Sequence, residues 1–186
     1  MKKVSFRIHA GVARSSIVRH PLRVGALRRA VTIYCPLGFT ATWNYLVSHA
    51  GPVDEDGPAL VRALDILETS RMAWLAEMAE YAARRRMEKR RNRAPDIGEY
   101  RYLTGFRWPG PDGPAATRHA VESLWTPDLA ELDRKTTDYV SAYLDGRPLE
   151  DVAALLPDPR PETYKIVQLI ANDIRTSAVT ANLAVS

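Results

Sequence analysis

The sequence predicts a mainly α-helical protein, an irregular helical bundle organised on one long central helix at about residues 58–92. Two observations predict this fold. Apolar residues recur at steps of three and four from Leu60 to Tyr81, which gives a helix one apolar face. Neither glycine nor proline interrupts the chain between Ala59 and Arg93. A chain of 186 residues is long enough to bury a core, so we treat it as one domain overall.

The distribution of charge suggests how that domain is organised. Residues 1–53 contain eight Lys or Arg and no Asp or Glu, residues 54–93 contain nine basic and eight acidic residues, and residues 94–186 contain nine and fourteen. We therefore expect residues 1–53 to form a basic arm and an uncharged apolar segment, packed on a helical domain at residues 54–186. Arginine outnumbers lysine 21 to 5, so a single arginine says little about function.

The N-terminal residues have an ambiguous pattern. Val4, Phe6 and Ile8 alternate with polar residues, which predicts a short half-buried strand, although no second strand follows to pair with it. An arm that packs across helices fits the same residues. Pro21 then favours the start of a helix that continues through Ala30.

Residues 30–53 contain no Asp, Glu, Lys or Arg, and three interpretations stay open. Burial in the core is favoured, because Pro36 and Gly38 lower the apolar content below that of a membrane-spanning helix. A single-pass membrane protein with a basic cytoplasmic arm is the second interpretation, and an export signal cleaved after Ala50 is the third. The lone Cys35 excludes an internal disulfide and a multi-cysteine metal site.

The ends of the long helix are marked in the sequence. Three acids at residues 54–56 precede Pro58, where carboxylates face the positive end of the helix dipole. At the other end Ala94 precedes Pro95, and a residue before proline avoids helical angles. The helix is therefore expected to stop before Ala94.

The remaining residues predict a loop-rich stretch followed by helices. Glycines and prolines break residues 94–116, and the aromatic segment 100–108 predicts a small hairpin or an ordered loop that covers the core. Four helices should follow: from Pro114 to Leu124, from Thr126 to Gly146, a short one after Pro148, and one from Pro161 to about Leu183.

The strongest candidate for function is the end of the long helix. Seven of the ten residues 84–93 are basic, against the single acid Glu88. Such a cluster would neutralise several phosphates, with binding that is sensitive to salt and indifferent to sequence. The alternative interpretation is a solvated helix end whose cations offset the helix dipole.

Aromatic side chains follow the cations closely along the chain. Tyr102, Phe106 and Trp108 would stack on unpaired bases, with Arg101 beside them, or would instead cover the core. The predicted nucleic-acid-binding residues are Arg84, Arg85, Arg86, Lys89, Arg90, Arg91, Arg93, Arg101, Tyr102, Phe106 and Trp108.

The sequence predicts no catalytic residue, cofactor or metal ligand. Glu77 and Glu80, and likewise His119 and Glu122, are three residues apart, but the Glu-x-x-His pairs of a helical dinuclear metal site are absent. No nucleophile or phosphate-loop motif occurs either. These absences favour a non-enzymatic protein.

We therefore expect a cytoplasmic accessory protein whose partner is a polyanion, with nucleic acid as the favoured one. One alternative is association with an anionic membrane surface through the basic arm. The other is a helical adaptor or homo-oligomer that pairs through the face of the long helix carrying Trp74 and Met78.

Overall fold

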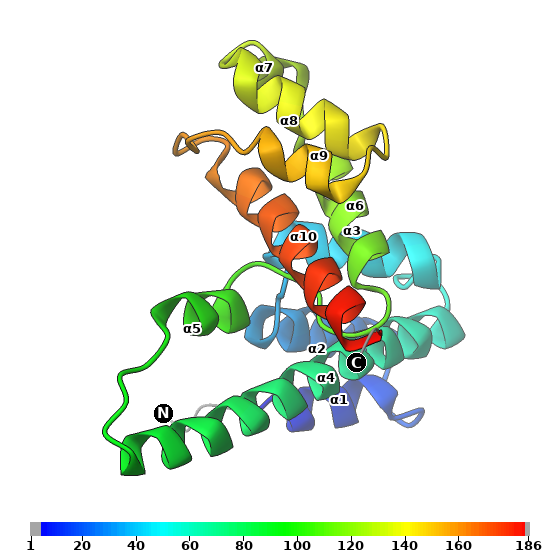
Figure 1. The fold of residues 1–186 in the computed structure, drawn as a ribbon. Helices are drawn as coiled ribbons and strands as arrows, with labels where there is room; N and C mark the ends of the chain where they lie inside the picture. Colours follow the sequence, from blue (N-terminus) through cyan, green and yellow to red (C-terminus); the bar gives the residue numbers. More distant parts are fainter. Residues whose placement is uncertain (1–4, 185–186) are drawn as a thin grey trace. The chain divides into compact units, whose positions relative to one another are not determined.

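The computed structural model describes the backbone of residues 5–184 and the side chains of residues 5–178. All regular structure in that part of the chain is helical (Figure 1). The helices are α1 (Phe6–Arg14), α2 (His20–Ile33), α3 (Phe39–Ala50), α4 (Gly57–Arg90), α5 (Ile97–Thr104), α6 (Gly113–Leu124), α7 (Pro127–Ala130), α8 (Arg134–Leu144), α9 (Leu149–Ala154) and α10 (Tyr164–Ala184). The prediction of a mainly α-helical fold with one long helix is confirmed, and α4 lies close to the expected residues 58–92.

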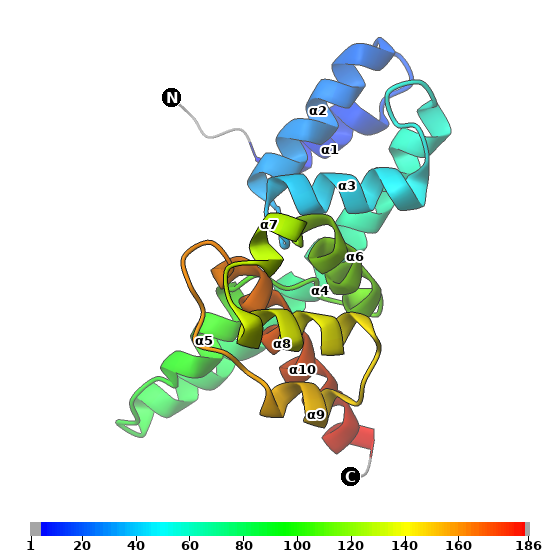
Figure 2. The same cartoon turned by 90° about the horizontal axis from the view of Figure 1, so that it is seen from above.

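The contacts divide the chain into two compact units, and the division lies at the end of α5. The first unit ends at Leu103 and the second begins at Thr104. The basic arm and the long helix therefore belong to the same unit, where α1, α2 and α3 each contact α4. Figure 2 shows these three helices gathered along the first part of α4.

The predicted N-terminal strand is wrong, because residues from Phe6 onward form α1. Phe6, Ala10 and Ala13 are buried at helical spacing, whereas Ile8, which the strand pattern placed inside, is exposed. Val4 lies outside the described residues. The alternation of apolar and polar residues was too short to distinguish a strand from the first turns of an amphipathic helix.

The uncharged segment forms part of the core of the first unit. It is divided between α2 and α3, with Gly38 in a left-handed conformation (φ 79°) between them. Val31, Leu37, Tyr45 and Leu46 are buried. Among the described residues, no helix has both the length and the apolar content that a membrane crossing requires.

Side-chain and backbone caps close both ends of α4. The Asp56 carboxylate accepts a hydrogen bond from the Ala59 N–H (2.9 Å), as expected for an N-cap. At the other end Asn92 adopts a left-handed conformation (φ 56°), and the Arg93 N–H donates to the Glu88 carbonyl (3.0 Å). This is a Schellman motif, so the helix ends before the expected Ala94–Pro95 stop.

The predicted hairpin in residues 100–108 is also wrong. Residues 97–104 form α5, and the Asp96 carboxylate begins it by accepting hydrogen bonds from the N–H groups of Gly98 (2.8 Å) and Glu99 (3.2 Å). The Asp96 side chain therefore starts a helix where the glycines and aromatic residues indicated a turn.

The second unit contains the later helices, most of which match the prediction. The helix expected from Thr126 to Gly146 is instead two, because Asp133 caps a new start at α8. Its carboxylate accepts from the N–H groups of Lys135 and Thr136 and from the Thr136 hydroxyl (2.7 Å), and these hydrogen bonds lower the pKa of Asp133.

The core of the second unit encloses an ionisable pair. The Tyr143 hydroxyl donates to the Asp173 carboxylate (2.8 Å), which joins α8 to α10. Both side chains are buried, and the loss of solvation raises the pKa of each. One turn before Tyr143, the buried Tyr139 hydroxyl has no hydrogen-bond partner among the described residues.

Candidate polyanion-binding surface

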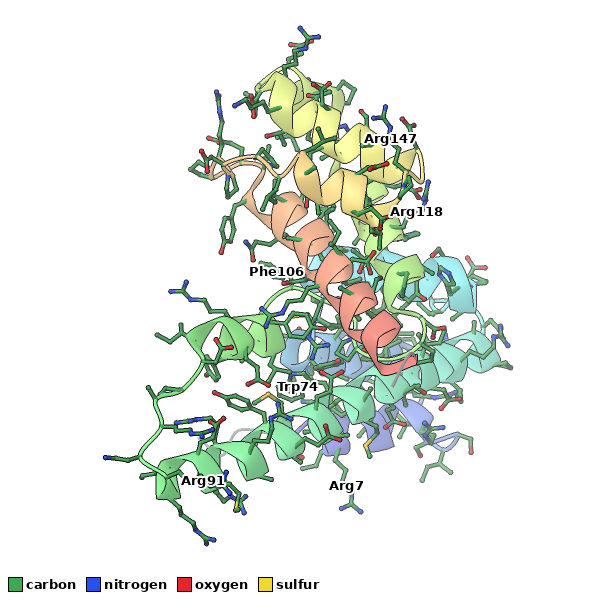
Figure 3. The ribbon with its side chains drawn as sticks, in the orientation of Figure 1. Arg7, Trp74, Arg91, Phe106, Arg118 and Arg147 are labelled. Carbon is green, nitrogen blue, oxygen red and sulfur yellow. The ribbon has the colours of Figure 1, made fainter. Side chains whose placement is uncertain are left out.

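The cationic end of α4, which we define as residues 84–93, is on the surface of the first unit. Arg86, Lys89 and Arg90 are exposed and stand three and four residues apart, so they share one face of the helix. Arg91 and Arg93 follow in the exposed turn that closes the helix. Figure 3 shows Arg91 at this end of α4.

Two cations of this cluster are held by carboxylates of the protein. Arg84 forms an ion pair with Glu99 of α5, and Arg85 forms one with Glu88 one turn along the same helix. Arg85 also reaches the carbonyl oxygens of Arg93 (3.5 Å) and Ala94 (3.4 Å). These two arginines therefore fasten the turn after α4, which makes them less available to a ligand.

The other cations of the cluster have no such compensation. The side chains of Arg86, Lys89, Arg90, Arg91 and Arg93 are exposed and form no hydrogen bond or ion pair with any other described residue. Arg101, on α5, is exposed in the same way. Five uncompensated positive charges within eight residues give a strong local positive potential that acts on any approaching anion.

The predicted aromatic residues are divided between the two units. Tyr102 is half-buried on α5, and Phe106 and Trp108 belong to the second unit. Trp108 is only 4% exposed, and the Lys165 ammonium lies 5.3 Å from the centre of the Phe106 ring. The burial of Trp108 supports the alternative interpretation that this ring covers the core.

One exposed ring close to the cluster belongs to the aromatic segment 100–108 that the sequence singled out but is not among the predicted binding residues. Tyr100 of α5 is half-exposed, and its ring centre lies 6.2 Å from that of Tyr81 on α4. The available signal was the position of Tyr100 immediately before Arg101, but the expected hairpin obscured which ring would face outward.

Cations of the basic arm are partly neutralised within the first unit. Arg14 pairs with Asp65 and Glu68, both at 2.6 Å, and these hydrogen bonds raise the pKa of Arg14. Arg28 lies 3.4 Å from Asp54 and 5.0 Å from the centre of the Trp43 ring. Among the other cations of the arm, Arg7, Arg19 and Arg29 are exposed, and Lys2 and Lys3 lie outside the described residues.

The helix face proposed for oligomerisation is in contact with the protein itself. The Trp74 indole N–H donates to the Leu103 carbonyl (3.1 Å), and the indole ring lies 5.8 Å from that of Tyr34. Met78, one turn further, is half-buried. These contacts leave only part of that face accessible to another molecule.

The residues considered as metal ligands are separated between the two units. Glu77 and Glu80 are on α4, whereas His119 and Glu122 are on α6, where Glu122 pairs with Arg118 (3.2 Å). Within the described part of the chain, no three His, Cys, Asp or Glu residues are arranged to hold a metal ion.

No family model, curated protein or solved structure matches this chain. Its surface chemistry is most distinctive at the cationic end of α4, where guanidinium and ammonium groups are hydrated and ready to exchange water for anionic oxygens. The arrangement suits electrostatic capture of an extended anion, because several cations act together along one edge.

Proposed function

We propose that this chain is a non-enzymatic accessory protein that binds a polyanion, with nucleic acid as the favoured ligand, through the cationic end of α4. One observation carries the proposal: Arg86, Lys89, Arg90, Arg91 and Arg93 are exposed and unpaired within the described part of the chain. Pairing with carboxylates of the protein would have reduced the repulsion among these cations, and the fold leaves them unpaired at the surface instead.

The proposed mode of binding is contact with phosphate oxygens. Arg86, Lys89 and Arg90 offer three neighbouring donors on one helix face, about 5–6 Å apart at Cβ, and Arg101 adds a donor on α5. Bound counterions leave the nucleic acid as these cations arrive, so affinity falls steeply with salt and depends little on base sequence.

Aromatic stacking is a secondary part of the proposal. Tyr102 remains a candidate from the predicted set, and Tyr100 is the most exposed ring of α5. Phe106 is in the second unit and stays a prediction from the sequence alone. A ring that stacks on an unpaired base contributes about 1–3 kcal/mol, which would favour a single strand over a duplex. Trp108 is left out of the mechanism because it is buried.

A pair of charge-matched variants tests the proposal. In the first, Arg86, Lys89, Arg90 and Arg91 are replaced by Gln; in the control, the exposed Arg134, Lys135, Arg147 and Arg160 are replaced by Gln. Each variant loses three arginines and one lysine, so each lowers the formal net charge from +4 by four, to zero. Any difference between them therefore reports position rather than total charge.

The measurement is affinity for a fluorescent oligothymidine and for an RNA of equal length, at several salt concentrations. We expect the first variant to lose binding, and the slope of log K against log salt to fall by about 3, since each neutralised phosphate of a single strand contributes about 0.7. The control should bind as the unaltered protein does. Equal losses in both variants, or no loss in the first, would contradict the proposal.

A second candidate function is supported by one observation in the basic arm. Ile17, between α1 and α2, is 94% exposed, and the exposed cation Arg19 is two residues away; Arg14 on the other side is paired with Asp65 and Glu68. An exposed apolar side chain beside a cation suits an anionic membrane surface, where a nearby cation contributes about 1 kcal/mol. Sedimentation with phosphatidylserine vesicles that is lost in Ile17→Asp and kept in the Arg86 to Arg91 variant would favour this alternative.

A further inference from the structure

The contact between α1 and α4 has one half with paired charges and one half without. In the first half the Arg14 guanidinium pairs with Asp65 and Glu68, both at 2.6 Å. In the second half the Arg71 guanidinium lies over the ring of Phe6, 4.5 Å from its centre. The two helices therefore run in opposite directions here, because later residues of α1 meet earlier residues of α4.

The spacing of residues along the two helices shows what the second half lacks. Arg7 precedes Arg14 by seven residues, about two helical turns, so both arginines stand on one face of α1. On α4, the positions seven residues after the two acids are occupied by Met72 and Leu75. Apolar side chains of α4 therefore stand in the second half where the first half has its carboxylates.

The second half is also hollowed at the surface. The hollow has a volume of about 290 Å³ and is lined by Phe6, Arg7, Glu68, Arg71 and Met72. Phe6 is buried and Met72 is 62% exposed, so the hollow has an apolar inner wall and an apolar rim. Its volume corresponds to about ten water molecules at about 30 Å³ each. This space suits a ligand of about ten non-hydrogen atoms, near the lower end of the range for small-molecule sites.

Arg71 is held in this hollow by ring packing. The ring of Phe6 meets that of Tyr34 edge-on, with 6.5 Å between the ring centres, and the Tyr34 hydroxyl shares a hydrogen bond with the Ser70 hydroxyl (2.9 Å). These contacts fix the ring on which the guanidinium lies. The N–H groups of Arg71 form no hydrogen bond or ion pair with another described residue, so they are left for water or for a ligand. A planar guanidinium fixed in this way matches a carboxylate.

The charges around the contact favour an anionic ligand. The carboxylate that lines the hollow, Glu68, is already paired with Arg14. Arg7 is exposed and forms no hydrogen bond or ion pair with another described residue. Together Arg7, Arg14, Arg71, Asp65 and Glu68 have a formal charge of +1, and the unpaired cations are the two that line the hollow. A ligand with one negative charge would balance this group.

We propose that this hollow binds a small monocarboxylate with a short apolar chain. The carboxylate lies on Arg71 and Arg7, and the chain lies against Phe6 and Met72. The ligand thereby supplies to the second half of the contact the negative charge that the acids of α4 supply to the first. The proposal does not depend on polyanion binding, because none of the residues that line the hollow belongs to the cationic end of α4.

The first test compares four probes, each titrated into the full chain while ¹H–¹⁵N spectra are recorded. Octanoate should saturate one site per chain and shift the amide signals of residues 6–7 and 68–72. Acetate lacks the chain, 1-octanol lacks the charge and octylammonium has the opposite charge, so each should bind at least about tenfold more weakly. No saturable octanoate binding, equal affinity for 1-octanol, or shifts centred on other residues would overturn the proposal.

The second test removes the cation that is fixed in the hollow. Arg71→Gln keeps a planar polar group beside Phe6 but removes the charge, so octanoate should bind at least about tenfold more weakly. The control Arg86→Gln makes the same change at an exposed arginine of the cationic end of α4 and should bind octanoate as the unaltered protein does. If both variants bind octanoate equally well, the carboxylate is not on Arg71 and the proposal is wrong.

The third test supplies the carboxylate from the protein itself. Met72→Asp places an acid at the position that corresponds to Asp65, where it can pair with the arginines of the hollow and exclude octanoate. The control Met87→Asp makes the same change at another exposed methionine of α4 and should keep octanoate binding. Both sites are more than half exposed, so circular dichroism should show unchanged helicity in each. Octanoate binding that persists in Met72→Asp would contradict the proposal.

Discussion

The two parts of α4 are one continuous helix in two different environments. Residues 57–70 contact α1, α2 and α3 and bury six side chains, those of Ala59, Leu60, Ala63, Leu64, Leu67 and Ser70, whereas residues 71–90 bury none. In the first part the helix is held by packing. In the second part the backbone hydrogen bonds continue, but the side chains meet water and α5.

The difference shows how one helix can be held by packing in its first part and present charged side chains to solvent in its second part. The packed part fixes the direction of the axis, and the helical backbone carries that direction to the cationic end, with α5 in contact along one side. A rigid element of this kind positions charges better than a loop would. Function is therefore expected in the part of α4 that contributes least to the core.

The largest expected effect is on the free energy of unfolding, and it distinguishes the packed part of α4 from the second part. Leu64→Ala removes a fully buried side chain and should lower the free energy of unfolding of the first unit by about 3 kcal/mol. Met78→Ala, on the half-buried continuation of the same helix, should cost less than about 1 kcal/mol. Urea denaturation followed by circular dichroism measures both, and equal losses would show that the second part is also packed.

A smaller effect compares the two ends of the helix. Asp56→Ala removes the side-chain cap and should lower the free energy of unfolding by about 1 kcal/mol, because that end belongs to the packed part. Asn92→Ala keeps residue 92 in a left-handed conformation but removes the polar side chain that helps asparagine to adopt it. The expected cost is about 1 kcal/mol.

The Asn92→Ala substitution should affect only the last turn of α4. Fraying of the last turn relieves the strain at residue 92, so the urea midpoint should stay the same while amide hydrogens of residues 86–93 exchange faster. If Asn92→Ala shifts the urea midpoint as much as Asp56→Ala does, the cationic end unfolds together with the core, and the proposed difference between the two parts is wrong.

Most of the fold could be predicted from the sequence because long periodic segments dominate it. The spacing of Leu60, Leu64 and Leu67 predicts the buried face of α4 directly, and a proline at or near the start marks α6, α7, α9 and α10. Short segments were harder. The first turns of α1 depend on contacts with α2 and α4, and the segment around Tyr100 depends on the Asp96 cap, which no short pattern encodes.

The candidate site could be predicted only in part. The positions of the seven cations follow from the sequence, but it does not reveal which of them are already paired. Arg84 pairs with Glu99 because α5 folds back beside α4, a tertiary contact fifteen residues away in the chain. Sequence spacing likewise could not show that Trp108 is buried while Tyr100 is half-exposed.

Trp74 lies near the border between the two parts of α4. Removing its hydrogen bond to Leu103 should have an intermediate effect on stability. Trp74→Phe keeps a ring beside Tyr34 but removes the N–H that donates to the Leu103 carbonyl (3.1 Å). The loss should be about 1 kcal/mol. Because this contact attaches α5, we expect the hydrogen exchange of residues 97–103 to change more than that of residues 57–70.

The smallest expected effect concerns the charges that join α1 to the packed part. Arg14→Gln removes ion pairs with Asp65 and Glu68 that are about half exposed, so the cost should be about 0.5 kcal/mol at low salt and should vanish near 1 M salt. The pKa of Arg14 is raised, so its charge is present throughout the neutral range and the cost should not vary with pH between 6 and 9. Leu64→Ala is the comparison: its loss in free energy of unfolding comes from apolar burial, which salt does not screen, so it should persist at high salt. If the cost of Arg14→Gln persisted at high salt, the aliphatic stem of Arg14 would be packing on α4. Apolar contacts of the Arg14 side chain, as well as its charge, would then join α1 to the packed part.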